Sequence, residues 1–130
     1  MQRTTIHHAS DADFAIGLRP FFAYRDLGVQ GATDAGFGAH VIRAVPGKHA
    51  EPEWHMHELG FQFIYILNGW VEFEYEDAGV VRLDKGSSAY QPPRIRHREL
   101  NHSDDLEILE ITMPGQFETA LVAASELVAG

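Results

Sequence analysis

The chain has 130 residues, a length that fits one domain, since most domains contain about 100–150 residues. Its formal net charge of −9 repels nucleic-acid phosphates and anionic lipid headgroups, so we expect neither nucleic acid nor membrane as a partner. No cysteine is present and no apolar run reaches the roughly 18 residues of a spanning helix, which predicts a soluble, cytoplasmic protein whose metals, if any, take nitrogen and oxygen ligands.

In chain order, the first predicted strands cover Phe21–Gly28 and Gly38–Val45. The apolar run Phe61–Leu67 then stops at Asn68-Gly69, a dipeptide typical of a type I′ turn, and Trp70–Tyr75 is predicted to return along it. Acidic and apolar residues alternate in that second strand, which turns its carboxylates to water and its apolar side chains to a core.

The run Phe61–Leu67 is apolar on both faces, so both faces should be covered. One face can fill the interior of a barrel. The other needs an N-terminal strand, a C-terminal helix or a partner subunit over it, and a homodimer is a reasonable expectation.

The C-terminal third is predicted to contain two strands and a helix. The strands are Val80–Leu83 and Leu106–Met113; in the second, neither face is purely apolar, which indicates a bulge and one of its two acids pointing inward. Apolar residues at steps of four, three and four predict a helix over about 116–129, namely Phe117, Leu121, Ala124 and Val128. Short strands, frequent turns and one small helix indicate an all-β barrel or sandwich of antiparallel strands over residues 1–130.

The pair His55-x-His57 is the first candidate for chemistry. In a strand, residues two apart point to the same side, so both imidazoles can converge on one ion if a third ligand comes from elsewhere. The alternative is a set of polar residues satisfied by ordinary hydrogen bonds.

Two segments resemble the motifs of the cupins, small jelly-roll barrels that hold a metal. The first motif, G-x5-H-x-H-x(3,4)-E-x6-G, is matched by His55, His57 and Gly69, with Gln62 at the acidic position and His49 in place of the first glycine, Gly47 lying two residues earlier. The second, G-x5-P-x-G-x2-H-x3-N, is matched by Gly86, Pro92, His97 and Asn101, with Arg94 in place of the glycine. The two matches lie within residues 47–101 and keep their register independently.

This resemblance implies a jelly-roll barrel with His55, His57 and His97 as metal ligands and Gln62 as a fourth. Gln62 can equally bond water or a ligand histidine. The donors suit one divalent transition metal: Fe, Mn, Ni, Cu or Zn. Because no carboxylate would offset its charge, we expect that metal to favour anionic co-ligands.

Other residues are candidates for substrate binding and proton transfer. Arg94, Arg96 and Arg98 alternate with His97, so they should form a solvated outer face, unless Arg94 reaches over the barrel mouth to clamp a substrate carboxylate. We expect Glu110 or Tyr90 to move a proton. The apolar residues expected to keep water from the substrate are Ile64, Ile66, Val71 and Phe73. Of the remaining histidines, His49 is the most probable to approach the site.

No Ser-His-Asp order, phosphate-binding glycine loop or dinucleotide fingerprint is present. The resemblance therefore implies a small metal-dependent enzyme, dioxygenase-like or isomerase/lyase-like, acting on a small, oxygen-rich and possibly anionic molecule. The alternative is a non-catalytic binding or sensor protein that uses the same barrel to hold a metal or small molecule.

Overall fold

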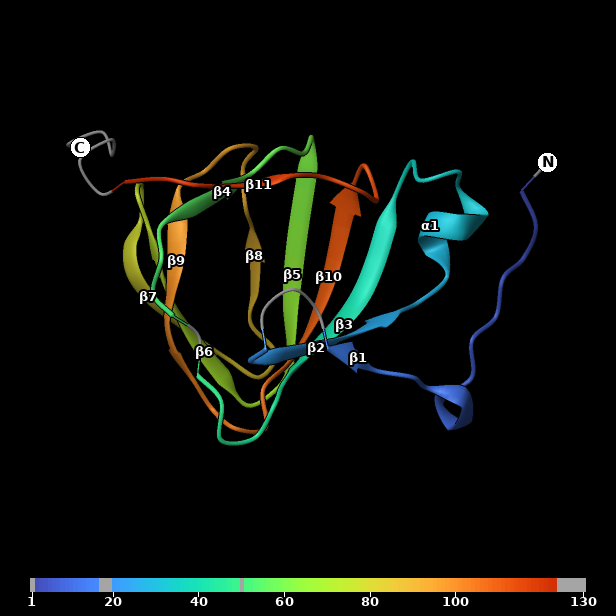
Figure 1. The fold of residues 1–130 in the computed structure, drawn as a ribbon, viewed down its shortest axis with the longest axis horizontal. Helices are drawn as coiled ribbons and strands as arrows, with labels where there is room; N and C mark the ends of the chain where they lie inside the picture. Colours follow the sequence, from blue (N-terminus) through green and yellow to red (C-terminus); the bar gives the residue numbers. More distant parts are fainter. Residues whose placement is uncertain (1, 17–19, 50, 124–130) are drawn as a thin grey trace.

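The computed structural model describes residues 2–16, 20–49 and 51–123, which form two antiparallel sheets packed face to face (Figure 1). In spatial order, the six-stranded sheet contains β1 (Ala15–Ile16), β2 (Phe22–Asp26), β3 (Gly38–Ala44), β10 (Glu107–Met113), β5 (Phe61–Asn68) and β8 (Ser88–Tyr90). The five-stranded sheet contains β11 (Thr119–Leu121), β4 (His55–His57), β9 (His97–His102), β6 (Trp70–Tyr75) and β7 (Gly79–Asp84).

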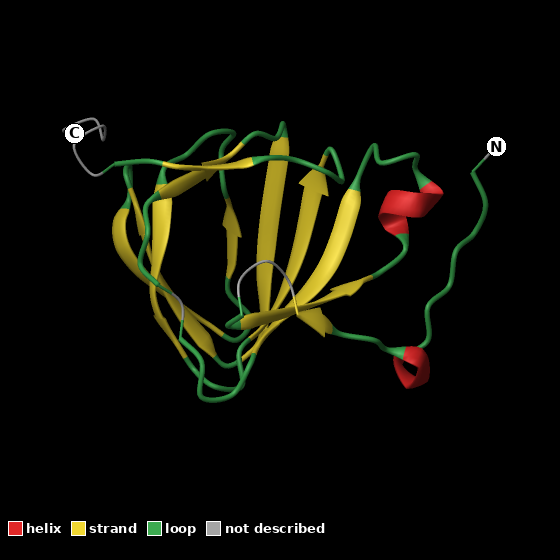
Figure 2. Ribbon diagram, in the orientation of Figure 1, coloured by secondary structure: helices red, strands yellow, loops and turns green. Residues whose placement is uncertain are grey.

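Helix is scarce in this fold (Figure 2). The described residues contain the short helix α1 (Val29–Ala32) and a 3₁₀ turn, η1 (Ala9–Asp11). No described helix has the length and apolar character that crossing a bilayer requires. The predicted all-β, jelly-roll class is confirmed, although the two sheets stay separate instead of closing into one continuous barrel.

The core lies between the sheets and follows the period-two pattern of the sequence. In β6, Val71, Phe73 and Tyr75 are buried at 0%, 4% and 8% exposure, while the glutamates between them are half-buried. Ile66 and Leu106, at 0% and 1% exposure, are among the most completely buried side chains. The alternation in β6 therefore predicted the correct inward face.

The predicted hairpin between β5 and β6 is wrong, because these strands belong to different sheets. Strand β5 pairs with β10 and β8, whereas β6 pairs with β7 and β9. Gly69 lies at the corner with a φ of 69°, and a Cβ there would collide with the Ser103 hydroxyl and lie 3.0 Å from the Cα of Leu106. The glycine thus allows a close crossing from one sheet to the other, where a hairpin was expected.

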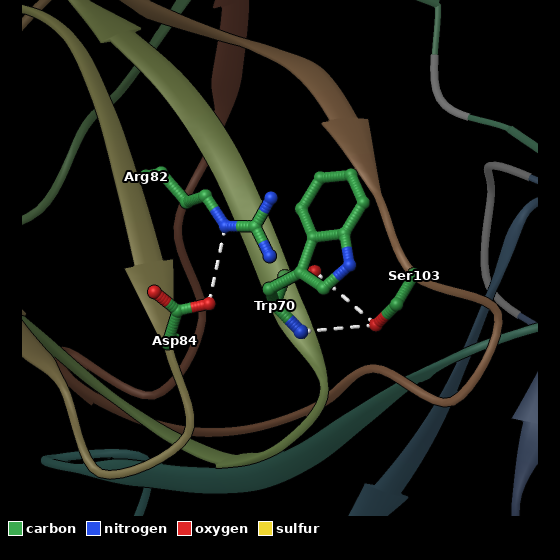
Figure 3. Close-up of polar contacts among 4 residues, drawn as sticks. All are labelled: Trp70, Arg82, Asp84 and Ser103. Carbon is green, nitrogen blue, oxygen red and sulfur yellow. Dashed lines mark hydrogen bonds and ion pairs between the residues drawn. The ribbon is translucent and has the colours of Figure 1, made fainter.

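Ser103 fixes the start of β6 after this corner (Figure 3). The Trp70 backbone N–H donates to Ser103 Oγ at 2.9 Å. Beside it, the Arg82 guanidinium lies 4.3 Å from the centroid of the Trp70 ring and forms an ion pair of 3.1 Å with Asp84. The side-chain contacts at this corner therefore anchor β6 to the β9–β10 connection and to β7.

The predicted C-terminal helix is also wrong where the structure describes it, because β11 occupies Thr119–Leu121 and pairs with β4. Residues 124–130 lie outside the described part of the chain. Phe117 and Leu121 are four residues apart, a spacing that one helical face and one strand face share. Here both side chains and that of Thr119 border the same cavity, as one face of a strand would, although Leu121 is 67% exposed.

The mixed pattern of β10 indicated a bulge in this strand, but the irregularity lies in its partner β5, where Leu67 is skipped in the register, while β10 pairs with β3 without a break from Glu107 to Thr112. Its register with β5 shifts between Glu107 and Ile108. After the shift, Glu110 lies between Ile64 of β5 and His40 of β3, and it faces the interior. Ordinary strand alternation therefore turns Glu110, with Ile108 two residues earlier, into the space between the sheets and leaves Glu107 on the other face.

Candidate metal centre

Three imidazoles meet at one end of the space between the sheets. His55 and His57 come from β4, and His97, directly opposite His55, comes from β9. The ring centroids are 4.3 Å apart for His55 and His97, and 5.0 and 5.2 Å apart for the pairs that include His57. One nitrogen from each ring lies within 4.8 Å of the others, so these three histidines, predicted from separate motifs, are positioned to bind a metal.

Hydrogen bonds at the far side of two of the rings set their tautomers. His55 Nδ1 lies 2.9 Å from the Glu53 carbonyl oxygen, and His97 Nδ1 lies 3.0 Å from the Ile95 carbonyl oxygen. A carbonyl can only accept, so both Nδ1 atoms carry hydrogen and both Nε2 atoms keep a lone pair for a metal.

The residues fit a divalent transition metal. Metal–imidazole bonds of about 2.1 Å bring two nitrogens to within about 4.2 Å of each other, and the three ring nitrogens here lie within 4.8 Å of one another without an ion. His55 and His97 are each only 3% exposed, so a bound ion would be shielded on the side of these rings. The donor set suits the same ions that the sequence indicated, from Fe and Mn to Ni, Cu and Zn.

The histidines open into a cavity of about 400 Å³ between the two sheets. Most of its wall is apolar or aromatic, formed by Phe22, Tyr24, Ile42, Ile64, Phe73, Ile108, Phe117 and Leu121. Its polar lining consists of the three histidines with Gln62, Gln91, Glu99, Glu110 and Thr119. No lysine or arginine of the described residues lines it.

An amide and a carboxyl group line this cavity from the six-stranded sheet, opposite the histidines. The Gln62 side-chain nitrogen donates to Glu110 Oε2 at 2.9 Å, and Gln62 is 3% exposed. Burial raises the pKa of the Glu110 carboxyl, while the Gln62 hydrogen bond and nearby His40 oppose that shift. Glu110 therefore keeps its proton to a higher pH than an exposed glutamate does.

Among the substrate and proton-transfer candidates, Ile64, Phe73 and Glu110 line the cavity, but four others do not, one of them Val71, which is buried in the core at 0% exposure. Ile66 is buried in the core at 0% exposure. Tyr90 is 57% exposed and packs beside the Phe61 ring at 5.8 Å. The Arg94 side chain is 68% exposed, outside the cavity.

His49 also lies away from the three-histidine site. Its ring packs against His102, with centroids 5.6 Å apart. Neither His49 nor His102 lines the cavity.

The outward arginines form ion pairs on the surface, which is the solvated face expected from their alternation with His97. Arg96 pairs with Glu76 at 3.4 Å, and Arg98 with Glu74 at 2.6 Å. Arg94 pairs with Glu58 at 3.0 Å and has a φ of 63°. Its left-handed backbone explains why the cupin motif has a glycine at this position.

Sequence reasoning missed several cavity residues. Glu99 shares the face of His97 at a spacing of two, a signal that was available. Gln91 had no signal; its side chain donates to Tyr75 Oη at 2.5 Å. Phe117 and Thr119 were hidden by the helical interpretation of the C-terminal segment.

Comparisons with known proteins agree with this geometry. A family model for the Cupin domain matches residues 41–112. The polyketide cyclase RemF from Streptomyces resistomycificus superposes with a TM-score of 0.74 at 19% identity, covering 96% of this chain and 89% of its own. KdgF from Halomonas sp. superposes with a TM-score of 0.69 at 19% identity, covering 86% of this chain and 94% of its own. The Fe(II) form of HppE superposes with a TM-score of 0.65 at 12% identity, covering 85% of this chain and 60% of its own.

No curated protein sequence matches the chain. The family assignment therefore rests on the family model, which spans more than half of the 130 residues, and the solved structures above share the fold. The histidines of the two motifs, His55 and His57 from the first and His97 from the second, also lie together in the structure. This chain belongs to the cupin family.

Proposed function

We propose that the protein is a metal-dependent enzyme that moves a proton on a small molecule, in the isomerase or lyase class of reaction. One observation carries this proposal. Three imidazoles and a buried carboxyl group line opposite walls of one 400 Å³ cavity, so a molecule in that cavity can touch both.

His55, His57 and His97 would hold the metal, with Gln62 as a proposed fourth ligand. When bound, a divalent metal supplies Lewis-acid chemistry that polarises a carbonyl or enol oxygen of the substrate. Since the three imidazoles are neutral, nothing in that set offsets the charge of the ion, which favours a substrate with an oxygen donor.

Glu110 is the proposed proton-transfer residue. Its carboxyl group lies in a largely apolar cavity, and burial raises its pKa, which suits a group that must both hold and release a proton. The Gln62 amide, through its hydrogen bond to Oε2, fixes the orientation of that carboxyl.

The cavity favours a substrate with an apolar body and one oxygen-bearing end. Its volume lies within the range of about 300–1,000 Å³ typical of small-molecule sites. A second anionic group on the substrate would find no lysine or arginine among the described lining residues, and it would meet Glu99 and Glu110 instead. The fold shared with a polyketide cyclase is consistent with a substrate of this kind.

The experiment is metal analysis of the purified protein, followed by incubation with small ketones, enols, diketones and catechols in deuterated water. NMR then follows hydrogen exchange on carbon, and an electrode follows oxygen uptake. We expect exchange that needs the metal, that is lost in Glu110→Gln and that persists in Glu107→Gln, a change on the same strand outside the cavity. Metal-dependent oxygen uptake without exchange would favour a dioxygenase, and tight binding without either reaction would favour a receptor.

We also propose that the protein forms a homodimer through the outer face of the six-stranded sheet. Phe61, Tyr65, Tyr90 and Met113 are exposed there by 38%, 39%, 57% and 40%, on the neighbouring strands β5, β8 and β10. No other described segment packs over these residues enough to bury them. Sedimentation should show a dimer for the wild type and a monomer for Tyr65→Asp; a monomeric wild type would contradict the proposal.

A further inference from the structure

The three imidazoles are not held in the same way. His55 and His97 each contact the backbone carbonyl of the residue two positions earlier, so their own strands orient them. His57 instead contacts a side chain 62 positions later: its Nδ1 lies 2.7 Å from the Oγ1 of Thr119. One of the three candidate ligands is therefore oriented by a distant segment.

That segment is β11, which runs beside β4 at the edge of the five-stranded sheet (Figure 1). Thr119 is directly opposite His57 in the register. Backbone hydrogen bonds flank the pair, with the Glu58 N–H donating to the Glu118 carbonyl at 2.8 Å and the Val122 N–H donating to the Trp54 carbonyl at 2.9 Å.

A second contact from the same segment reaches the ring of His57. The Phe117 ring meets it edge-on, with centroids 5.4 Å apart and an interplanar angle of 77°. Phe117, Thr119 and Leu121 also line the cavity, so the segment is part of the site's wall as well as a support for the ligand.

The chemistry of the partner atom matters. A carbonyl oxygen can only accept, so it leaves the imidazole one choice of tautomer. A hydroxyl can accept from Nδ1–H, which leaves the Nε2 lone pair for a metal, or donate to Nδ1, which places hydrogen on Nε2 and blocks that atom. Only the first arrangement permits metal binding through Nε2.

We propose that Thr119 is a positioning residue for the metal centre: its hydroxyl accepts the Nδ1–H of His57 and so directs Nε2 toward the site. This inference rests on the proposed metal site and extends it to the C-terminal strand. The site then has two ligands oriented by local backbone and one whose orientation depends on β11 lying against β4.

The test replaces the hydroxyl while keeping the shape. Thr119→Val removes the acceptor, and Thr119→Ser retains it. The matched control is Thr112→Val, because Thr112 is a threonine on β10 that is 1% exposed and whose hydroxyl has no hydrogen-bond partner among the described residues. Affinity is measured for Co²⁺ by competition with a chromophoric chelator, together with the visible absorption of the bound Co²⁺, which reports its coordination.

We expect Thr119→Val to bind Co²⁺ about 10- to 100-fold more weakly, the usual cost of losing the partner of a metal-binding histidine. The serine and Thr112→Val variants should stay within about threefold of the wild type, well inside that cost. An unchanged affinity in Thr119→Val would overturn the proposal, and so would an equal loss in Thr119→Val and Thr119→Ser.

A second measurement needs no metal. Nitrogen-15 NMR of the metal-free protein reports which nitrogen of His57 carries hydrogen, and we expect the share of the Nδ1–H form to fall in Thr119→Val and to be kept in Thr119→Ser. An unchanged share in Thr119→Val would contradict the positioning role. If the wild type binds no metal at all, the proposed function fails. This measurement still decides whether Thr119 determines which nitrogen of His57 carries hydrogen.

Discussion

The two sheets bring different chemistry to the same cavity. The five-stranded sheet supplies the three imidazoles, which we call the metal wall, from β4 and β9. The six-stranded sheet supplies Gln62 and Glu110, which we call the acid wall, from β5 and β10. A molecule bound between them would meet Lewis-acid chemistry on one side and a proton carrier on the other.

The walls also differ in how their groups are stabilised. On the metal wall, the Nδ1 atoms of His55 and His97 lie within hydrogen-bond distance of backbone carbonyls and that of His57 lies beside the Thr119 hydroxyl, and these contacts orient the rings. On the acid wall, the pair Gln62 and Glu110 lies among apolar side chains, and the apolar surroundings act on the carboxyl pKa. The three histidines of the metal wall are positioned to bind a metal, and the proton-transfer role of the acid wall is the part that we propose.

The largest expected effect comes from removing one ligand of the metal wall. His97→Ala should weaken metal binding by about 10²- to 10⁴-fold, if a quarter to a third of a typical site energy of about 10–16 kcal/mol is lost, and turnover should disappear with it. His102→Ala is the control, since His102 lies on the same strand, is equally buried at 3% exposure and does not line the cavity. Metal content is measured by plasma emission spectrometry. Equal content in the wild type and His97→Ala would contradict the assignment of His97 as a metal ligand.

Removing the acid of the other wall should separate the two chemistries. Glu110→Gln keeps the size and an acceptor for the Gln62 amide but cannot exchange a proton, so we expect kcat to fall by at least about 100-fold with metal content unchanged. Steady-state kinetics and metal analysis on the same preparation measure both quantities. A parallel fall in metal content would mean that Glu110 supports metal binding instead of proton transfer.

Tyr75 tests the contact between the walls, because it lies on β6 and accepts a hydrogen bond from Gln91, which follows β8. Burial raises the pKa of Tyr75 to about 12 from the ordinary value of 10.0, so the folded form resists ionisation that the unfolded chain allows. The wild type should therefore lose stability as pH rises between these two values, by about 1.4 kcal/mol at about pH 11, relative to Tyr75→Phe. Urea unfolding at about pH 9 and about pH 11 measures this difference; parallel curves for the two proteins would contradict it.

The smallest expected effect lies at the rim of the metal wall. Arg94→Gly removes a side chain from a left-handed backbone position and an exposed ion pair with Glu58. Relief of the backbone strain should outweigh the loss of a surface ion pair, so we expect Tm to rise by a few degrees. Calorimetry measures the shift. A lower Tm, or a change in substrate affinity, would show that Arg94 contributes to the site despite lying outside the cavity.

Several features could be predicted from the sequence because their signals are local. The alternation in β6 predicted its buried face, and the mixed pattern of β10 predicted an acid turned inward, although the expected bulge lies in β5 and not in β10. The two motif segments predicted the convergence of His55, His57 and His97, since each motif carries its own register.

Other features could not be predicted because short-range patterns are ambiguous. Asn68-Gly69 is typical of a hairpin, but the close approach of Ser103 and Leu106 makes it a corner between sheets. Phe117 and Leu121 are spaced for a helix and for a strand alike, and only pairing with β4 selects the strand. Tyr90 carries suitable chemistry in the sequence, yet it lies on the outer face.

The sequence by itself determined which residue types could bind a metal, the all-β class and the inward face of β6, because strand periodicity and ligand spacing are properties of neighbouring residues. Tertiary structure alone decided which strands pair, which of the candidate side chains share the cavity and how each imidazole is oriented. Those depend on contacts between segments far apart in the chain, of which the 62-residue separation of His57 and Thr119 is the clearest example.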